Sequence, residues 1–328
     1  MLLPVDDPFS AEAHGPLSDR PLALVELDDA PDLLPAPIII GIDRAGVLPD
    51  IDPAPFTAFV TTRPDAPAPW VSVSPDRIDA QLAAVQHAVA ACPHAATIFT
   101  RVLRITGRLP FADALEVESL AYSALLAGDE FRRWRAAHPA TTLAASAGAP
   151  VRYERARDHV TLTLAAPATR NAMDAAMRDA LWELLANIVA DPSLPSVTLR
   201  AEGRCFSAGG DLAEFGSAGD LAAAHHIRTA RSAALLLMRL GERASVYLHG
   251  ACIGSGIEIP AAAARRTGAA DLIVQLPELR MGLMPGAGGT VTLARAIGRH
   301  RLAWLVLGGF RIGARRALDW GLIHAVSP

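Results

Sequence analysis

The chain contains no lysine, and all 30 of its basic residues are arginines. This excludes Schiff-base catalysis by a lysine amine, and any phosphate group must be bound by arginine or by backbone N–H groups. The three cysteines are widely separated and form no CxxC pair. Their number and spacing argue against a disulfide framework or a zinc site and favour a reducing compartment.

Long apolar runs and basic runs are also missing. No continuous apolar run reaches the length of about 18 residues that a membrane-spanning helix needs. The N-terminus, MLLPVDDPFS, lacks the positive charge and apolar stretch of a signal peptide. With a formal net charge of −4, nothing attracts a nucleic acid or an anionic membrane surface. We therefore predict a cytoplasmic protein without nucleic-acid or membrane partners, although a small phosphorylated ligand remains possible.

The N-terminal half divides by composition. Residues 1–75 hold 14 of the 25 prolines, which disfavour long helices, so we expect only short strands at 38–42 and 56–61. Residues 76–137 have apolar positions at helical spacing and predict about three helices. The run at 138–150 is small and polar, which is typical of a linker.

Within the helical segment, two boundaries and one apolar stripe are readable. The first helix is expected to be capped by Ser74 or Asp76, and Pro93 starts a new helix. Further along, one stripe at helical spacing contains Leu115, Glu118, Tyr122, Leu125 and Leu126.

Residues 151–328 alternate between strand and helix patterns. HVTLTLA, SVTLRAEG and SVYLHG predict strands, whereas MDAAMRDALWELLANIVA predicts a helix with Asp174 near its start. The run at 220–240 predicts one further helical stretch. Repeated β-α units imply a largely parallel sheet with helices outside it.

Two glutamates in this half stand in apolar sequence beside glycine-rich turns. Glu258 lies between two isoleucines. Glu278 follows it by 20 residues and stands shortly before the loop GLMPGAGGT. Burial of an ionised carboxylate is costly and raises its pKa toward neutrality, where it can exchange protons. The pair therefore suggests acid and base chemistry.

Each glycine-rich turn has a functional and a structural interpretation. In RCFSAGGDLAEF, small residues allow backbone N–H groups to form half of an oxyanion hole, but Asp211 and Glu214 also have the spacing of a helix capping box. Residues 254–256 would supply the other half at the start of a helix. There, Ser255 and Glu258 have capping-box spacing as well.

Taken together, these runs resemble the enoyl-CoA hydratase/isomerase family, also called the crotonase superfamily. The resemblance covers roughly residues 151–326. It implies an α/β fold with a crotonase-like ββα spiral core, preceded here by an N-terminal extension of short strands and helices. The matching runs are RNAM at 170–173, CFSAGGDL at 205–212, HGACIGSGIE at 249–258, LPELRMGLMPGAGGT at 276–290 and the closing GGFRIGARRALDWGLIHAV.

The resemblance implies roles for four residues. The N–H groups of Ala208 and Ser255 would form the oxyanion hole for a CoA thioester carbonyl, where such a donor contributes about 3–4 kcal/mol. Glu258 and Glu278 match both glutamates of the hydratases, in which one carboxylate takes a proton from the attacking water and a proton is delivered at the α-carbon. The pair favours hydration of a 2-enoyl-CoA to a 3-hydroxyacyl-CoA.

The resemblance also implies binding residues and partners. Arg170 is a candidate contact for a CoA phosphate, with a role in surface charge as the competing interpretation. The only expected partner is an acyl-CoA thioester, with no metal and no cofactor beyond the coenzyme A of the substrate. The family assembles as trimers or hexamers, so we expect a homo-oligomer. The other residues expected to bind the substrate are Ala172, Gly209, Gly210, Asp211, Leu212, Gly254, Met281, Pro285 and Gly286.

Two positions depart from the family pattern. Ser255 stands where glycine is common, which has no consequence if only its N–H is used. Pro260 is expected early in a helix, where it would remove a donor and could re-aim Glu258. His225 and His226 are interpreted as solvated helix residues, and His249 as a packing residue at a strand end.

The family normally continues with helices that cover the active site, whereas this sequence stops soon after GLIHAV. Residues 80–135 resemble those terminal helices. We therefore predict that they supply the same cover from the N-terminal side, and that residues 1–75 are a degenerate first core. An unrelated helical extension is the alternative.

Three alternatives to hydration stay open. The same fold could carry out double-bond isomerisation, or retro-aldol cleavage or thioester hydrolysis. A crotonase-like subunit that binds acyl-CoA or a partner without turnover is a further possibility of a different class.

Overall fold

The protein is described by a computed structural model that covers residues 21–27, 36–139 and 148–327. Its N-terminal part begins with a four-stranded sheet in which every strand is parallel to its neighbour, in the order β1-β2-β3-β4. All six residues of β2 are buried, as its isoleucine-rich sequence requires in a parallel sheet. The strands are β1 (Leu22–Glu26), β2 (Ile38–Asp43), β3 (Ala58–Thr61) and β4 (Trp70–Ser72).

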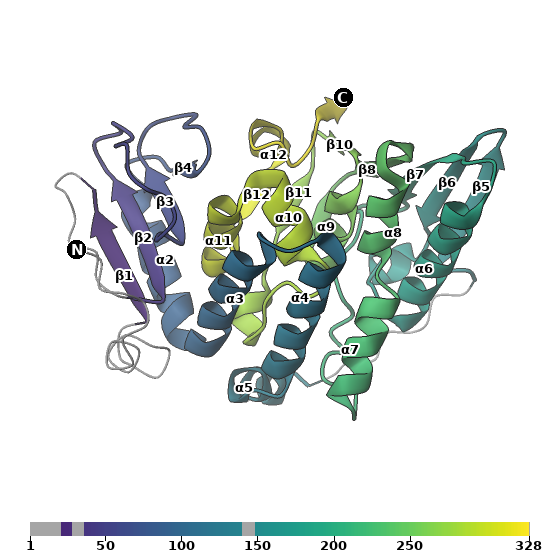
Figure 1. The fold of residues 1–328 in the computed structure, drawn as a ribbon, viewed down its shortest axis with the longest axis horizontal. Coiled ribbons are helices and arrows are strands. Elements are labelled where there is room, and N and C mark those ends of the chain that lie inside the picture. The colour runs from purple at the N-terminus through teal and green to yellow at the C-terminus, as the bar shows by residue number, and fades with distance from the viewer. Residues whose placement is uncertain (1–20, 28–35, 140–147, 328) are drawn as a thin grey trace.

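Four helices follow this sheet, and in Figure 1 the first lies behind the N-terminal strands while the second and third lie in front near the centre of the molecule. Four are found where about three were predicted, because the glycine at 128 separates two of them. Pro93 starts a helix as predicted. The predicted caps Ser74 and Asp76 are wrong, because the first helix begins at Ile78 without a side-chain cap. The helices are α2 (Ile78–Ala91), α3 (Pro93–Thr106), α4 (Phe111–Leu126) and α5 (Asp129–Ala137).

The C-terminal part contains a six-stranded sheet in the order β13-β10-β8-β7-β6-β5, parallel except for the β5–β6 hairpin. A second sheet has the order β12-β11-β9, with β9 and β11 parallel. The strands are β5 (Val151–Ala156), β6 (His159–Leu164), β7 (Ser196–Ala201), β8 (Ala244–Leu248), β9 (Ala251–Ile253), β10 (Arg265–Ala269), β11 (Ile273–Gln275), β12 (Arg311–Gly313) and β13 (Ala325–Ser327).

The helices of this part pack around the two sheets (Figure 1). Asp174 caps α6 through its carboxylate, which accepts a hydrogen bond from the N–H of Met177 at 2.7 Å. The stretch at 220–240 is not one helix, because Ser232 caps a second helix after a break. The α-helices are α6 (Ala175–Ala190), α7 (Leu221–Ala230), α8 (Ala233–Leu240), α9 (Ser255–Glu258), α10 (Gly289–Ile297), α11 (Arg299–Gly308) and α12 (Ala314–Asp319), with 3-10 helices η1 (Pro167–Thr169), η2 (Gly241–Arg243), η3 (Pro260–Ala262) and η4 (Glu278–Met281).

One continuous apolar core joins the N-terminal and C-terminal parts. It contains Ile40 of β2 and Phe99 of α3 together with Leu162 and Leu199 of the larger sheet. Polar contacts add to this packing, since the guanidinium of Arg301 on α11 donates to the backbone carbonyls of Trp70 and Ala66. The N-terminal part is therefore packed against the C-terminal part as one folded body.

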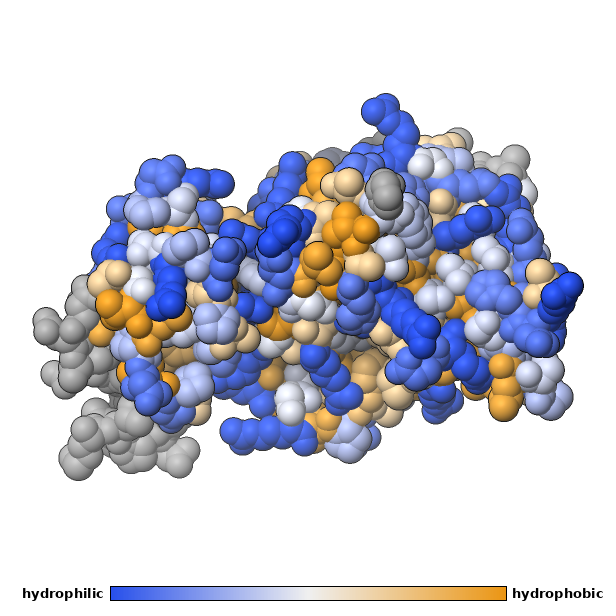
Figure 2. All heavy atoms as spheres, turned by 90° about the horizontal axis from the view of Figure 1, so that it is seen from above, coloured by the Kyte–Doolittle hydropathy of each residue, from blue (hydrophilic) through white to orange (hydrophobic). Residues whose placement is uncertain are grey.

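Among the described residues, no single helix is long and apolar enough to span a membrane, and only the pair α2 and α3, bent by 106°, has the combined length and composition. The surface view in Figure 2 shows hydrophilic side chains over most of one face, with apolar side chains in small groups between them.

The crossing of α5 and η4 gives a direct test of this packing. Gly282 has a φ of +69°, and a Cβ there would lie 2.6 Å from the carbonyl carbon of Glu130. We expect Gly282→Ala to lower the free energy of unfolding by about 1–3 kcal/mol, measured by urea denaturation. Gly107→Ala is the matched control, because its Cβ would meet only the carbonyl of Leu103 at 3.5 Å. Equal stability of the two variants would contradict the packing.

Candidate active site

Glu258 and Glu278 are brought together by two neighbouring strands. β9 and β11 run parallel, with Ile253 opposite Gln275. The segments that follow the two strands therefore leave the sheet at the same edge. Glu258 closes α9 after β9, and Glu278 opens η4 after β11.

The two carboxyl groups approach each other beside Gly254. A Cβ on this glycine would lie 2.6 Å from Oε1 of Glu278 and 3.8 Å from Oε1 of Glu258. Both side chains are buried, with Glu258 at 2% and Glu278 at 6% exposure. Glu278 Oε2 and the hydroxyl of Ser255 have no hydrogen-bond partner within the described parts of the chain. The Oε1 atoms of two buried carboxyl groups thus lie on the same side of Gly254, close to each other.

A third buried glutamate, Glu118 of α4, completes this cluster. The four consecutive backbone N–H groups of residues 287–290 alternate between two glutamates. The first and third donate to Oε2 of Glu258 at 2.7 and 3.0 Å. The second and fourth donate to Oε1 and Oε2 of Glu118 at 2.6 and 2.8 Å. The N–H groups at the start of α10, which have no partner within the helix, are thereby shared by carboxylates from α4 and α9.

Burial raises the pKa of all three carboxyl groups. For Glu258, burial first and then the charges of Glu278 and Glu118 raise the pKa well above its ordinary value, against its two backbone hydrogen bonds. Burial raises the pKa of Glu278 to about 8. It raises the pKa of Glu118 to about 7, against the hydrogen bonds from the loop. These groups can therefore exchange protons near neutral pH.

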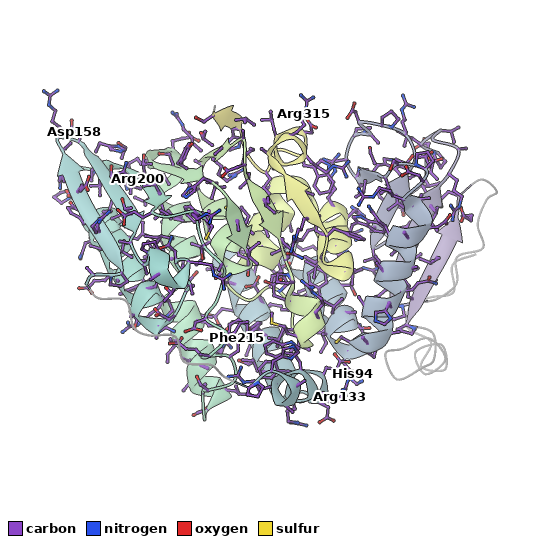
Figure 3. The ribbon with its side chains drawn as sticks, turned by 180° about the vertical axis from the view of Figure 1, so that it is seen from behind. His94, Arg133, Asp158, Arg200, Phe215 and Arg315 are labelled. Atoms are coloured by element: carbon purple, nitrogen blue, oxygen red, sulfur yellow. The ribbon has the colours of Figure 1, made fainter. Side chains whose placement is uncertain are left out.

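A cavity of about 610 Å³ opens onto the cluster. Its walls come from α4, α7, the loop after β7 and the loop before α10. Phe215, labelled in Figure 3, is part of the loop that follows β7, and its ring lies against Gly210. The predicted site residues that line the cavity are Gly210, Asp211, Ser255, Glu258, Glu278 and Gly286.

The prediction that Ala208 supplies an oxyanion-hole donor is wrong. Its N–H donates to the carbonyl of Arg170 at 2.9 Å, and Ala208 does not line the cavity. Gly210 does line it, and its N–H makes no hydrogen bond within the described residues. A Cβ at this position would lie 2.6 Å from the ring of Phe215. Gly210 and Ser255 are therefore two cavity-lining positions whose N–H groups make no hydrogen bond within the described residues.

The other predicted binding residues lie outside the cavity wall. Arg170 is exposed and has a φ of +57°, and Leu212 is 51% exposed. Gly254 lies behind the two glutamates rather than on the wall. The remaining predicted residues outside the wall are Ala172, Gly209, Met281 and Pro285.

The capping boxes considered for the two glycine-rich turns do not form. The side chain of Ser255 caps nothing in the described structure, and Glu258 bonds to the loop before α10 instead. Glu214 accepts from the N–H of Ala175 at the start of α6 at 3.1 Å. Pro260 lies early in a helix as predicted, since it follows α9 and is the first residue of the 3-10 helix η3.

One histidine assignment also needs correction. His225 is buried rather than solvated, and its ring contacts the hydroxyl of Ser119 and the carboxylate of Glu116. His226 is exposed, as predicted. His249 follows β8, and its Nε2 contacts the carbonyl of Gly203 at 3.1 Å.

The helical segment 76–137 lies at this site. Glu118 and Tyr122 of α4 line the cavity. From α5, Arg135 donates to the carbonyls of Leu212 and Ala213 in the loop after β7. The position that a covering role requires is thus occupied by α4 and α5, whereas the correspondence to the family's terminal helices stays a prediction. Glu118 was not predicted as a site residue, although a glutamate within an apolar stripe was a readable signal.

Comparison with known proteins places the chain. Residues 156–328 match the enoyl-CoA hydratase/isomerase family, and the chain belongs to that family. It is similar to a probable enoyl-CoA hydratase of Bacillus subtilis, with 33% identity over 163 residues, which cover 47% of this chain and 60% of the relative. It is also similar to the 2,3-dehydroadipyl-CoA hydratase of Escherichia coli, with 32% identity over 167 residues, which cover 51% and 65%.

Among solved structures, enoyl-CoA hydratase from Bacillus anthracis matches with 28% sequence identity and a TM-score of 0.50, over 55% of this chain and 70% of that one. The crotonase-like α/β fold predicted from the sequence is confirmed. The chain spans less than two thirds of the length of the curated relatives described above.

The raised pKa of Glu118 predicts a pH dependence of stability. Between its ordinary value of 4.5 and about 7, this group binds more protons in the folded than in the unfolded protein, so its contribution to stability is lost as pH rises through this window. We expect Glu118→Gln to flatten the fall in the free energy of unfolding, measured by urea denaturation at a series of pH values. The exposed Glu183→Gln variant should follow the wild type. A Glu118→Gln curve parallel to the wild type would contradict the assignment.

Proposed function

We propose that this protein adds water to a 2-enoyl-CoA thioester and forms a 3-hydroxyacyl-CoA. The observation that carries this proposal is the meeting of Glu258 and Glu278 at one point of a largely apolar cavity. Gly210 and Ser255, whose N–H groups make no hydrogen bond within the described residues, line the same cavity and support it. Family membership supports the same class of chemistry.

In the proposed reaction, the thioester carbonyl oxygen accepts hydrogen bonds from the N–H groups of Gly210 and Ser255. These donors stabilise the negative charge that develops on this oxygen as the enolate forms. Ser255 lines the cavity at the start of α9, where the first backbone N–H groups of a helix have no partner within the helix. The required group on the substrate is therefore a carbonyl conjugated to the double bond.

The glutamates take complementary roles in this scheme. The pKa of Glu258 is also raised, and we assign it the role of base because two backbone N–H groups on its Oε2 oppose that rise. It removes a proton from water as the water oxygen bonds to the β-carbon. Glu278, whose pKa is raised to about 8, is protonated at neutral pH and gives its proton to the α-carbon. One proton is taken and one is given, so the reaction needs no cofactor beyond the coenzyme A of the substrate.

The test is an assay of the purified protein with crotonyl-CoA and longer 2-enoyl-CoAs. The product is identified by mass spectrometry in ¹⁸O-labelled water. We expect Glu258→Gln and Glu278→Gln each to lower kcat by about 10²- to 10⁴-fold, because each removes one proton-transfer group. Glu183→Gln on α6, which is exposed and not part of the cavity wall, is the matched control and should retain the wild-type rate.

The alternatives have separate signatures in the same assay. A shifted double bond without ¹⁸O incorporation identifies an isomerase, and free coenzyme A identifies a thioester hydrolase. Hydration at the wild-type rate in both glutamine variants would overturn the proposed roles of Glu258 and Glu278. Tight binding of acyl-CoA without any product would identify a binding subunit.

A further inference from the structure

Arg228 of α7 is a cavity-lining arginine without an acidic partner. Three arginines line the cavity. Arg178 and Arg231 both bond to the carboxylate of Asp179, at 2.8 and 3.0 Å. Within the described residues, Arg228 forms no ion pair. No carboxylate of the described cavity wall is therefore in ion-pair contact with Arg228.

The hydrogen bonds of Arg228 go to neutral oxygens only. Its Nε donates to the hydroxyl of Ser119 at 3.0 Å, and its Nη2 donates to the carbonyl of Ser119 and to the hydroxyl of Ser123. These contacts fix the plane of the guanidinium against α4. Its Nη1 donates to no group in the described parts of the protein. The Nη1 side of the guanidinium, which is held in a fixed plane, is thus available to a ligand.

The neighbouring acidic side chains are already occupied. The carboxylate of Glu118 accepts the N–H groups of the loop before α10. The carboxylate of Glu116 contacts Nε2 of His225 at 3.1 Å. Burial also lowers the pKa of Arg228, and the charges of Tyr122 and Glu118 oppose this effect only in part. Pairing of Glu118 or Glu116 with Arg228 would therefore require the carboxylate to give up its present partners.

The position of Arg228 indicates which part of a substrate it would meet. Its Cζ lies 5.1 Å from the centre of the Tyr122 ring. That ring packs against Gly286, where a Cβ would lie 2.3 Å from it. The next residue along the loop, Ala287, bonds to Glu258. Tyr122 therefore links the loop that holds Glu258 to the guanidinium of Arg228.

A thioester with its carbonyl at the oxyanion donors and its β-carbon at the glutamates would therefore extend its acyl chain past Tyr122 toward Arg228. The wall along this route is mostly apolar, which suits methylene groups, and ends at a cation. We propose that Arg228 binds a carboxylate at the far end of the acyl chain, so that the substrates are CoA thioesters of unsaturated dicarboxylic acids. This inference rests on the proposed function for the placement of the thioester.

The test compares matched acyl chains in the wild-type protein. Hydration of trans-2-hexenedioyl-CoA is measured against trans-2-hexenoyl-CoA, and the eight-carbon pair in the same way. In at least one of the two pairs, we expect kcat/KM to be about 10- to 100-fold higher for the chain with the terminal carboxylate than for the uncharged chain of the same length. A charge-assisted hydrogen bond allows a difference of this size. Equal values, or a preference for the uncharged chain at both lengths, would overturn the proposal without any variant.

Two variants then assign the preference to the residue. Arg228→Met should remove the preference mainly through KM and leave the hydration of the uncharged chains within a few-fold of the wild type, whereas Arg228→Lys should retain part of it. Arg239→Met removes an exposed arginine on α8 outside the cavity wall and should keep the full preference. A preference that survives in Arg228→Met would overturn the assignment.

Two further measurements are needed. The first distinguishes the acyl carboxylate from the coenzyme phosphates as the anion that Arg228 binds, and the second distinguishes the carboxylate site from the proposed hydration. Pantetheine thioesters of the same acyl groups lack the nucleotide phosphates. An effect of Arg228→Met that disappears with them would show that Arg228 binds the coenzyme instead, against the proposal. Calorimetric binding of adipoyl-CoA against hexanoyl-CoA needs no turnover. A preference for adipoyl-CoA without hydration of any enoyl-CoA would contradict the proposed function and support the carboxylate site.

Discussion

The start of α10 is the point on which the rest of the site depends. A helix leaves its first backbone N–H groups without partners, and here these groups are buried rather than solvated. Two carboxylates satisfy them in alternation, Glu258 from the C-terminal part and Glu118 from α4. The favourable end of the helix dipole offsets part of the cost of bringing two acidic groups into an apolar region.

Several features follow from this arrangement. The carboxyl of Glu258 is held at Oε2 by the loop, so its Oε1 is directed toward Gly254 and Glu278. The loop itself is held by α4, and therefore the N-terminal helices help to position a group that belongs to the C-terminal part. The glycine at 286 then gives the Tyr122 ring the space to form the wall between the glutamates and Arg228.

Much of the fold was readable from local sequence. Strand patterns in the C-terminal half predicted three of the six strands of the larger sheet, β6, β7 and β8, and Asp174 marked the start of α6. Boundaries that depend on single side chains were harder. The break before Ser232 was missed because alanine and leucine continue the helical pattern on both sides of it.

The site was predicted where short motifs carry it and missed where distant segments meet. Glu258 and Glu278 were found because each stands beside its own glycine-rich turn. Ala208 was chosen over Gly210 because the sequence does not reveal that the carbonyl of Arg170 takes the N–H of Ala208. Glu118 was missed because its partners lie 170 residues and more along the chain.

The most direct test of the carboxylate cluster is a pH titration of the glutamate side chains by ¹³C NMR, with each signal assigned by single substitution. The account predicts that the carboxyl signals of Glu118, Glu258 and Glu278 titrate well above 4.5, and that substitution of one shifts the midpoints of the others. Midpoints of all three near 4.5, each unaffected by loss of its neighbours, would contradict it.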